Sequence, residues 1–121
     1  MRQKESAIRD KSIEFAIRIV KLCRYLNDEK KEYVLSKQLL RSGTAIGALI
    51  READYAESKA DFIHKIHIAT KEASETEYWI LLLYKSGLIT VKEFESIQPE
   101  INQINRILVA ILKTSKSKKI S

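Results

Sequence analysis

The scarcity of turn-forming residues is the feature that most constrains this chain. Its 121 residues include three Gly and one Pro, and both Gly43 and Gly47 lie inside a stretch with helical periodicity. All-β and doubly wound α/β folds need frequent turns, which Gly and Pro largely supply. With 45% hydrophobic and 31% charged residues, the chain is typical of a globular domain. The sequence therefore predicts one all-α domain of long helices with few connections.

Apolar residues recur at steps of three and four along most of the chain, the spacing that lines one face of an α-helix. In the first segment this repeat joins Ile8, Phe15, Ile19, Leu22 and Leu26. Comparable repeats follow, and together they predict helices at about residues 4–26, 37–57, 59–86 and 91–114.

Local signals predict where these helices begin and bend. Ser36 is expected to be the N-cap of the second helix, while Ser58 with Asp61 has the spacing of a capping box for the third. Thr90 begins a second capping box before the fourth helix. Pro99 removes a backbone N–H within that helix, so we expect a kink or a break just before it.

Short links between helices of similar length place sequence neighbours antiparallel. This predicts an up-down-up-down four-helix bundle over residues 1–114. Residues 115–121 have no apolar periodicity and are predicted to form a basic mobile tail.

Two segments carry more apolar surface than one bundle core can bury. Ile13, Ile17 and Val20 form a second apolar stripe on the first helix. Either that helix is unusually deep or the stripe meets another subunit, and we favour a homo-oligomer interface there. The run from Tyr78 to Tyr84 is apolar around the whole helix, so we expect core and subunit contacts to enclose it.

Cysteine content and the length of apolar runs indicate the cellular compartment. Cys23 is the single cysteine and cannot form an intramolecular disulfide. The first residues lack the apolar run of a signal peptide, and no uncharged run approaches the roughly 20 residues of a bilayer span. We expect a cytoplasmic protein with no membrane segment.

The sequence offers no recognisable catalytic or metal-binding constellation. Asp61-x-x-His64 occurs once, whereas di-iron bundles need a Glu-x-x-His motif on each of two helices. Glu72 and Glu75 fit ion pairs with neighbouring side chains better than acid–base chemistry. Cys23 lies among apolar residues, as a packing thiol does. We therefore expect no enzyme activity, no metal and no cofactor.

The strongest functional signal is basic charge arranged along helix faces. Lys and Arg exceed Asp and Glu by 22 to 16, a net charge of +6. One outward strip on the second helix, and the polar arc of the first, carry residues that can contact phosphates or stack on a base: Lys37, Arg41, Arg51 and Tyr55, with Lys11, Arg18 and Lys21. A solvated helix face has much the same pattern, so both interpretations remain open.

Three segments together resemble a known family. They are Arg41-Ser42-Gly43-Thr44-Ala45-Ile46-Gly47-Ala48-Leu49-Ile50-Arg51-Glu52-Ala53, Glu57-Ser58-Lys59-Ala60-Asp61-Phe62-Ile63-His64-Lys65 and Ile68-Ala69-Thr70-Lys71-Glu72-Ala73-Ser74-Glu75-Thr76-Glu77-Tyr78-Trp79. They are similar to the bacterial four-helix-bundle proteins encoded in intervening sequences of 23S rRNA genes. Two positions depart from the family pattern: Leu49 stands where Asn is typical, and Pro99 interrupts the fourth helix.

The resemblance implies a four-helix bundle that assembles as a ring-like homopentamer without enzymatic activity. A related branch, the accessory proteins of diversity-generating retroelements, is a basic pentamer that binds nucleic acid and a reverse transcriptase. The first functional hypothesis is therefore a non-enzymatic homo-oligomer that binds RNA or DNA. The alternative is an oligomeric module whose partner is a protein and which has no nucleic-acid role.

Overall fold

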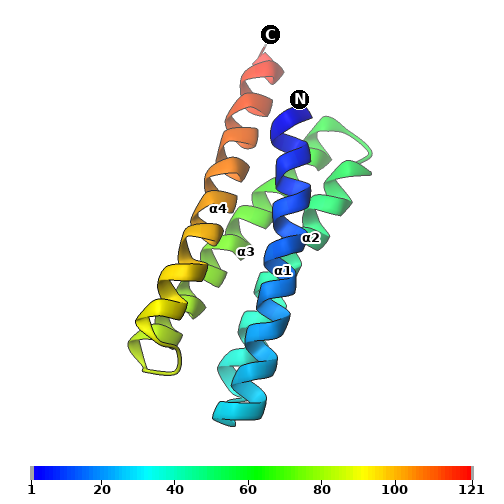
Figure 1. The fold of residues 1–121 in the computed structure, drawn as a ribbon. Helices are drawn as coiled ribbons and strands as arrows, with labels where there is room; N and C mark the ends of the chain where they lie inside the picture. The colour runs from blue at the N-terminus through cyan, green and yellow to red at the C-terminus, as the bar shows by residue number, and fades with distance from the viewer. Residues whose placement is uncertain (1, 121) are drawn as a thin grey trace.

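Four α-helices make up the fold in the computed structural model, which describes residues 2–120 and the side chains of residues 7–117. They are α1 (Arg2–Lys30), α2 (Val34–Asp54), α3 (Lys59–Lys85) and α4 (Val91–Ile120) (Figure 1). Within these residues there is no strand. The predicted all-α, four-helix architecture is confirmed.

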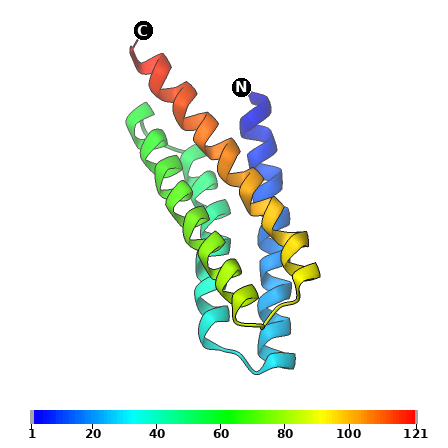
Figure 2. The same ribbon diagram turned by 90° about the vertical axis from the view of Figure 1, so that its left-hand side faces the viewer.

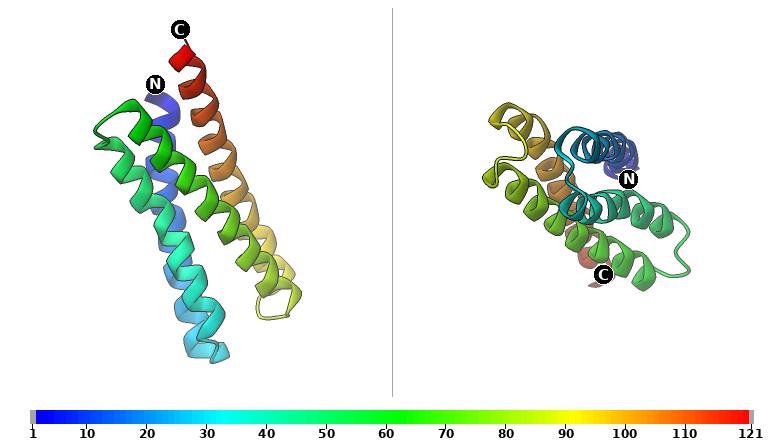
Figure 3. Two further views of the ribbon diagram at one scale, coloured as in Figure 1. Left: turned by 180° about the vertical axis from the view of Figure 1, so that it is seen from behind. Right: turned by 90° about the horizontal axis from the view of Figure 1, so that it is seen from below.

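Each helix packs against the next one in the chain, and α1 also contacts α4, though less extensively. Figure 2 shows both chain ends and the α2–α3 turn at one end, with the other two turns at the opposite end. Viewed from below, the helices surround one core (Figure 3). Its largest fully buried side chains come from all four helices: Ile8, Phe15, Ile19, Leu26, Leu39, Ile46, Ile66, Ile80, Leu83, Ile101, Ile104 and Leu108.

The link between α1 and α2 begins and ends at residues other than those predicted. The first helix continues four residues past the expected end, to Lys30, and stops where Lys31 adopts a positive φ of 53°. The second helix begins at Val34 rather than residue 37, and Ser36 is buried inside it, so the Ser36 N-cap was wrong. Its hydroxyl instead lies 2.9 Å from Asn27 Oδ1.

Glu32 takes the capping role that the sequence assigned to Ser36. Its carboxylate accepts hydrogen bonds from the backbone N–H groups of Val34, Leu35 and Ser36 at 3.1, 2.9 and 2.8 Å. Burial favours the neutral acid, but these bonds outweigh it and lower the pKa of Glu32. A charged side chain thus satisfies three N–H groups that the helix cannot satisfy itself.

The third helix begins and ends close to where its signals predicted. Ser58 Oγ accepts from the Asp61 N–H at 3.0 Å, as expected for its N-cap. At the other end, Gly87 has a φ of +82°. The N–H groups of Gly87 and Leu88 donate to the carbonyls of Tyr84 and Leu83, which is a Schellman motif.

The fourth helix is longer and more regular than predicted. Thr90 and Glu93 exchange the two hydrogen bonds of a capping box, at 2.7 and 3.1 Å. The helix is unbroken through Pro99, so of the expected kink or break the break is excluded. It also continues to Ile120 where a mobile tail was expected, and Ser121 lies outside the described residues. Lysines near a helix C-terminus interact favourably with the helix dipole. A search for apolar repeats does not detect this contribution.

Small and polar residues mark the closest approach of helices in the core. A Cβ placed on Gly43 would lie 3.0 Å from two side-chain atoms of Ile19, so this glycine lets α2 approach α1 closely. Ser42 and Thr76 are fully buried, with their hydroxyl oxygens 2.9 Å apart across α2 and α3. Leu49, where the family pattern has Asn, packs against the apolar core.

Candidate nucleic-acid interface

The seven residues predicted to contact nucleic acid do not form one continuous surface. Lys37, Arg41, Arg51 and Tyr55 belong to α2 or its C-terminal end, while Lys11, Arg18 and Lys21 belong to α1. On each helix one candidate, Arg41 on α2 and Arg18 on α1, turns toward another helix and binds a carboxylate there. The structure therefore separates candidates that the helical spacing had grouped.

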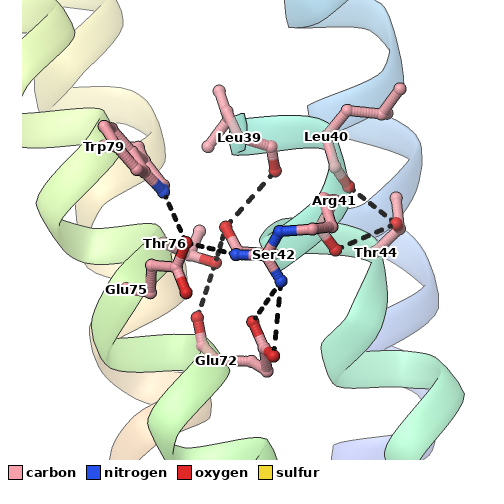
Figure 4. Close-up of polar contacts among 9 residues, drawn as sticks. All are labelled: Leu39, Leu40, Arg41, Ser42, Thr44, Glu72, Glu75, Thr76 and Trp79. Atoms are coloured by element: carbon pink, nitrogen blue, oxygen red, sulfur yellow. Dashed lines mark hydrogen bonds and ion pairs between the residues drawn. The ribbon is translucent and has the colours of Figure 1, made fainter. Parts of the chain in front are cut away.

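Arg41 faces α3, where two carboxylates already neutralise it (Figure 4). Its Nη1 lies 3.1 Å from Glu72 Oε1, and its Nη2 pairs with Glu75. The hydrogen bond from Arg41, with a second one from Trp79 Nε1 at 2.9 Å, lowers the pKa of Glu75. Arg41 therefore joins α2 to α3, and a phosphate would have to displace these carboxylates to bind it.

Arg18 faces α4 and donates hydrogen bonds to residues on either side of Pro99. Its guanidinium donates to the Ser96 carbonyl at 3.1 Å, to Ser96 Oγ at 3.0 Å and to Glu100. In a helix Pro99 removes the N–H that would bond to the carbonyl four residues earlier, that of Glu95. Arg18 binds the next carbonyl, so it ties α1 to this turn without replacing the lost bond, and like Arg41 it is paired with a carboxylate on another helix.

The other candidate cations have no ion pair among the described residues. Arg51, Lys21 and Lys37 are exposed, and Lys11 is half-buried. Tyr55 is 80% exposed, so its ring is accessible for stacking. These groups, rather than Arg18 and Arg41, remain available to an anion.

The predicted subunit stripe shares its surface with part of this set. Ile13 and Ile17 are 54% and 50% exposed, and with Val20 they line a hollow of about 450 Å³ between α1 and α2, here called the α1–α2 groove. Lys21, Arg24 and Arg51 also line it. The groove is thus lined by both apolar and basic side chains.

Sequence reasoning did not select Arg24 as a site residue. It follows Lys21 by three positions on one helix, a spacing that places both on neighbouring parts of one face. What the sequence could not show is that Arg51 of another helix lies beside the same groove.

A second apolar surface lies on the outer side of α3. Tyr78 is 56% exposed and Leu81 is 43% exposed, although we expected the run from Tyr78 to Tyr84 to be enclosed. Ile80 and Leu83 of this run face the core of the chain, whereas enclosure of Tyr78 and Leu81 by another subunit stays a prediction. We call Tyr78 and Leu81 the α3 patch.

The surroundings of Cys23 suit a packing role rather than a catalytic one. Burial, and secondarily the charge of Glu32, raises the pKa of Cys23 to about 11, and its Sγ lies 3.2 Å from the Ser36 carbonyl oxygen. Such a thiol is a poor nucleophile at neutral pH. Over the described residues, no group of three or more His, Cys, Asp or Glu side chains is placed to hold a metal ion, and none of the described helices has the length and apolarity of a membrane span.

Comparison with known proteins identifies the family. The family model of the 23S rRNA-intervening sequence proteins matches residues 4–110. The chain belongs to this family. The matched range includes all the candidate residues on α1 and α2, both apolar surfaces and Pro99.

A solved structure supports the same relationship. The crystal structure of a protein of unknown function from the S23 ribosomal protein family, from Bacteroides thetaiotaomicron VPI-5482, is 54% identical with a TM-score of 0.90. The match covers 92% of this chain and 99% of that one. A comparison with curated proteins gave no match. The two matches that were found show the family and the fold of this chain.

Proposed function

We propose that this protein is a non-enzymatic homopentamer of up-down-up-down bundles that binds RNA or DNA through phosphate contacts. The observation that carries the proposal is the set of exposed cations, Lys21, Lys37 and Arg51, that no carboxylate of the described residues neutralises. Each chain adds a net charge of +6. Exposed, unpaired cations gain affinity from the counterions that a bound phosphate backbone releases.

The distribution of apolar surface supports the ring assembly. A cyclic oligomer with more than two subunits uses two different surfaces that meet head to tail. The chain has two such surfaces, the α1–α2 groove and the α3 patch. Packing one against the other would bury Ile13, Ile17 and Tyr78, which a single chain leaves exposed.

A protein partner is the second candidate, favoured by the character of the α1–α2 groove. An amphipathic helix with acidic flanks would place its apolar face on Ile13 and Ile17 and its carboxylates near Arg24 and Arg51. In that case the basic charge would select the partner rather than bind phosphate.

Salt-dependent binding tests the nucleic-acid proposal. Labelled structured RNA and duplex DNA are titrated at two salt concentrations with protein whose mass is known from light scattering. We expect binding that weakens steeply with salt, because each neutralised phosphate contributes about 0.9 to the slope of log K against log salt for duplex DNA. Absence of binding at low salt would contradict the proposal and favour the protein partner.

Matched variants test the α2 residues. Lys37→Gln with Arg51→Gln should reduce that slope by about two, since two phosphate contacts are lost. Lys71→Gln with Lys92→Gln is the control, because it removes the same charge from exposed positions on α3 and α4. Arg41 is left intact because its loss would unpair Glu72 and Glu75. Unchanged affinity in the folded Lys37/Arg51 variant would remove these two residues from the site.

A further inference from the structure

Residues 115–120, the end of α4, are helical where the sequence predicted a mobile tail. Core burial along this helix ends at Leu112. Lys113, Thr114, Lys116 and Ser117 are exposed, yet the helix continues to Ile120. Figures 1 and 2 show this end reaching past the other helices, at the end of the molecule where α1 begins. Lysines in this segment are therefore held at fixed helical positions.

Three described cations share the solvent-facing side of this helix. Arg106 is followed by Lys113 seven positions later and by Lys116 after three more. At about 1.5 Å per residue these intervals are roughly 10 Å and 5 Å, or two turns and one turn. All three side chains are exposed, and none has a carboxylate partner among the described residues.

Acidic residues are missing from this part of the sequence. Glu100 is the last Asp or Glu of the chain, so residues 101–121 contain basic residues without a compensating acid. By contrast, the first ten residues of α4 contain Glu93, Glu95 and Glu100. The positive charge of α4 is thus concentrated toward one end of the bundle.

We propose that Arg106, Lys113 and Lys116, here called the α4 rail, bind the phosphate backbone of a nucleic acid without reading its sequence. This inference rests on the proposed function and names an element that carries it. Long, flexible Lys and Arg side chains at these intervals can each reach a phosphate of one strand, because phosphates repeat about every 3.4 Å along its axis. Because the helix already orders the backbone, binding requires less ordering than a disordered lysine tail would.

Favourable interaction with the helix dipole is the competing role for Lys113 and Lys116. Cations near a helix C-terminus stabilise it whether or not a ligand binds. This role would change helix content and leave affinity for nucleic acid unaltered, so the two roles have different readouts.

The test compares two triple variants with equal loss of charge. Arg106→Gln, Lys113→Gln and Lys116→Gln remove the rail, whereas Lys30→Gln, Lys85→Gln and Lys92→Gln remove three exposed cations at the opposite end. Both are titrated with a labelled duplex of about 12 base pairs, roughly one helical turn. Circular dichroism checks that each variant keeps its helix content.

We expect the rail variant to lose more than tenfold in affinity near 0.15 M salt and about 2.5 to 3 in the salt slope, while the control stays close to the unmodified protein. Equal losses in both triples would overturn the rail, because net charge alone would explain them. Unchanged binding in the rail variant, with binding lost in the Lys37/Arg51 variant, would overturn the rail and leave the proposed function standing. Failure of the unmodified protein to bind at low salt would overturn both.

Discussion

The hydroxyl pair Ser42 and Thr76 is a fully buried polar contact between α2 and α3. Thr76 Oγ1 lies 2.9 Å from Ser42 Oγ and 2.8 Å from the carbonyl oxygen of Glu72 (Figure 4). Among the described side chains, no buried nitrogen or oxygen atom lacks a hydrogen-bond partner. Slippage of one helix against the other would break the hydrogen bond between the two hydroxyls, so the pair favours a single alignment.

Thr76→Val keeps the shape of the side chain and removes its hydroxyl. We expect the free energy of unfolding to fall by about 1–2 kcal/mol, because Ser42 loses its buried partner. Thr70→Val is the control on the same helix, since Thr70 bonds only to the carbonyl of His67, at 2.6 Å. Chemical denaturation measures both variants, and equal losses would contradict a specific role for the pair.

Cys23 should make stability depend on pH in the alkaline range. In the unfolded chain the thiol ionises near pH 8.5, whereas burial holds its pKa at about 11 in the fold. Between these values the unfolded state has released a proton that the native state keeps. Stability is therefore full below about pH 8.5 and falls as pH rises toward 11.

Denaturant unfolding at pH values on either side of this window checks the prediction. Cys23→Ala lacks the thiol, so its stability should vary less with pH than that of the unmodified protein. Other groups titrate in this range in both proteins, and the difference between the two curves isolates Cys23. Parallel curves would show that the buried thiol contributes nothing.

At the scale of helices, apolar periodicity was sufficient to predict all four, because every helix buries a face with three- and four-residue spacing. Ends were harder to predict. The first helix ends before Lys31, whose positive φ is not expected for a lysine. Glu32, rather than the predicted Ser36, accepts hydrogen bonds from the first N–H groups of α2. Pro99 did not break α4, and Arg18 of α1 binds the Ser96 carbonyl in the turn before it. Contacts of this kind join residues distant in sequence, so local patterns do not contain them.

Two glycines one turn apart on α2 should respond to alanine with opposite signs. Gly47→Ala should raise the free energy of unfolding by about 0.5–1 kcal/mol, because alanine favours helix and its Cβ would meet Ser12 Oγ at an ordinary 3.5 Å. Gly43→Ala should lower it by about 1–3 kcal/mol through overpacking against the fully buried Ile19. Thermal and denaturant unfolding measure both, and a gain at Gly43 would show that Ile19 yields readily.

On the scale of the whole molecule, the structure divides the basic residues into two groups. Arg9, Arg18 and Arg41 bind carboxylates on other helices and hold the bundle together. Lys37, Arg51 and the α4 rail have no such partner among the described residues. Composition and spacing predicted a basic surface but could not make this division, because each pairing depends on how helices are placed.

Oligomer formation through the α1–α2 groove is a prediction at this scale. Ile17→Glu places a charge in the proposed interface, where burying it without a partner is unfavourable. We expect the variant to remain folded and to have the mass of a smaller species by light scattering. Val34→Glu is the control, because Val34 is 72% exposed at the start of α2 and outside the groove. An unchanged mass for Ile17→Glu would exclude the groove as the interface.

The shared position of the two chain ends has a practical consequence for such experiments. A purification tag fused to either terminus would be tethered at the same end as Lys113 and Lys116 (Figure 2). A polyhistidine tag would add ligand-binding groups there, and an acidic tag would compete for the lysines. Probes and labels are better attached at the opposite end, in the α3–α4 turn, where Ser86 beside Gly87 is exposed to solvent.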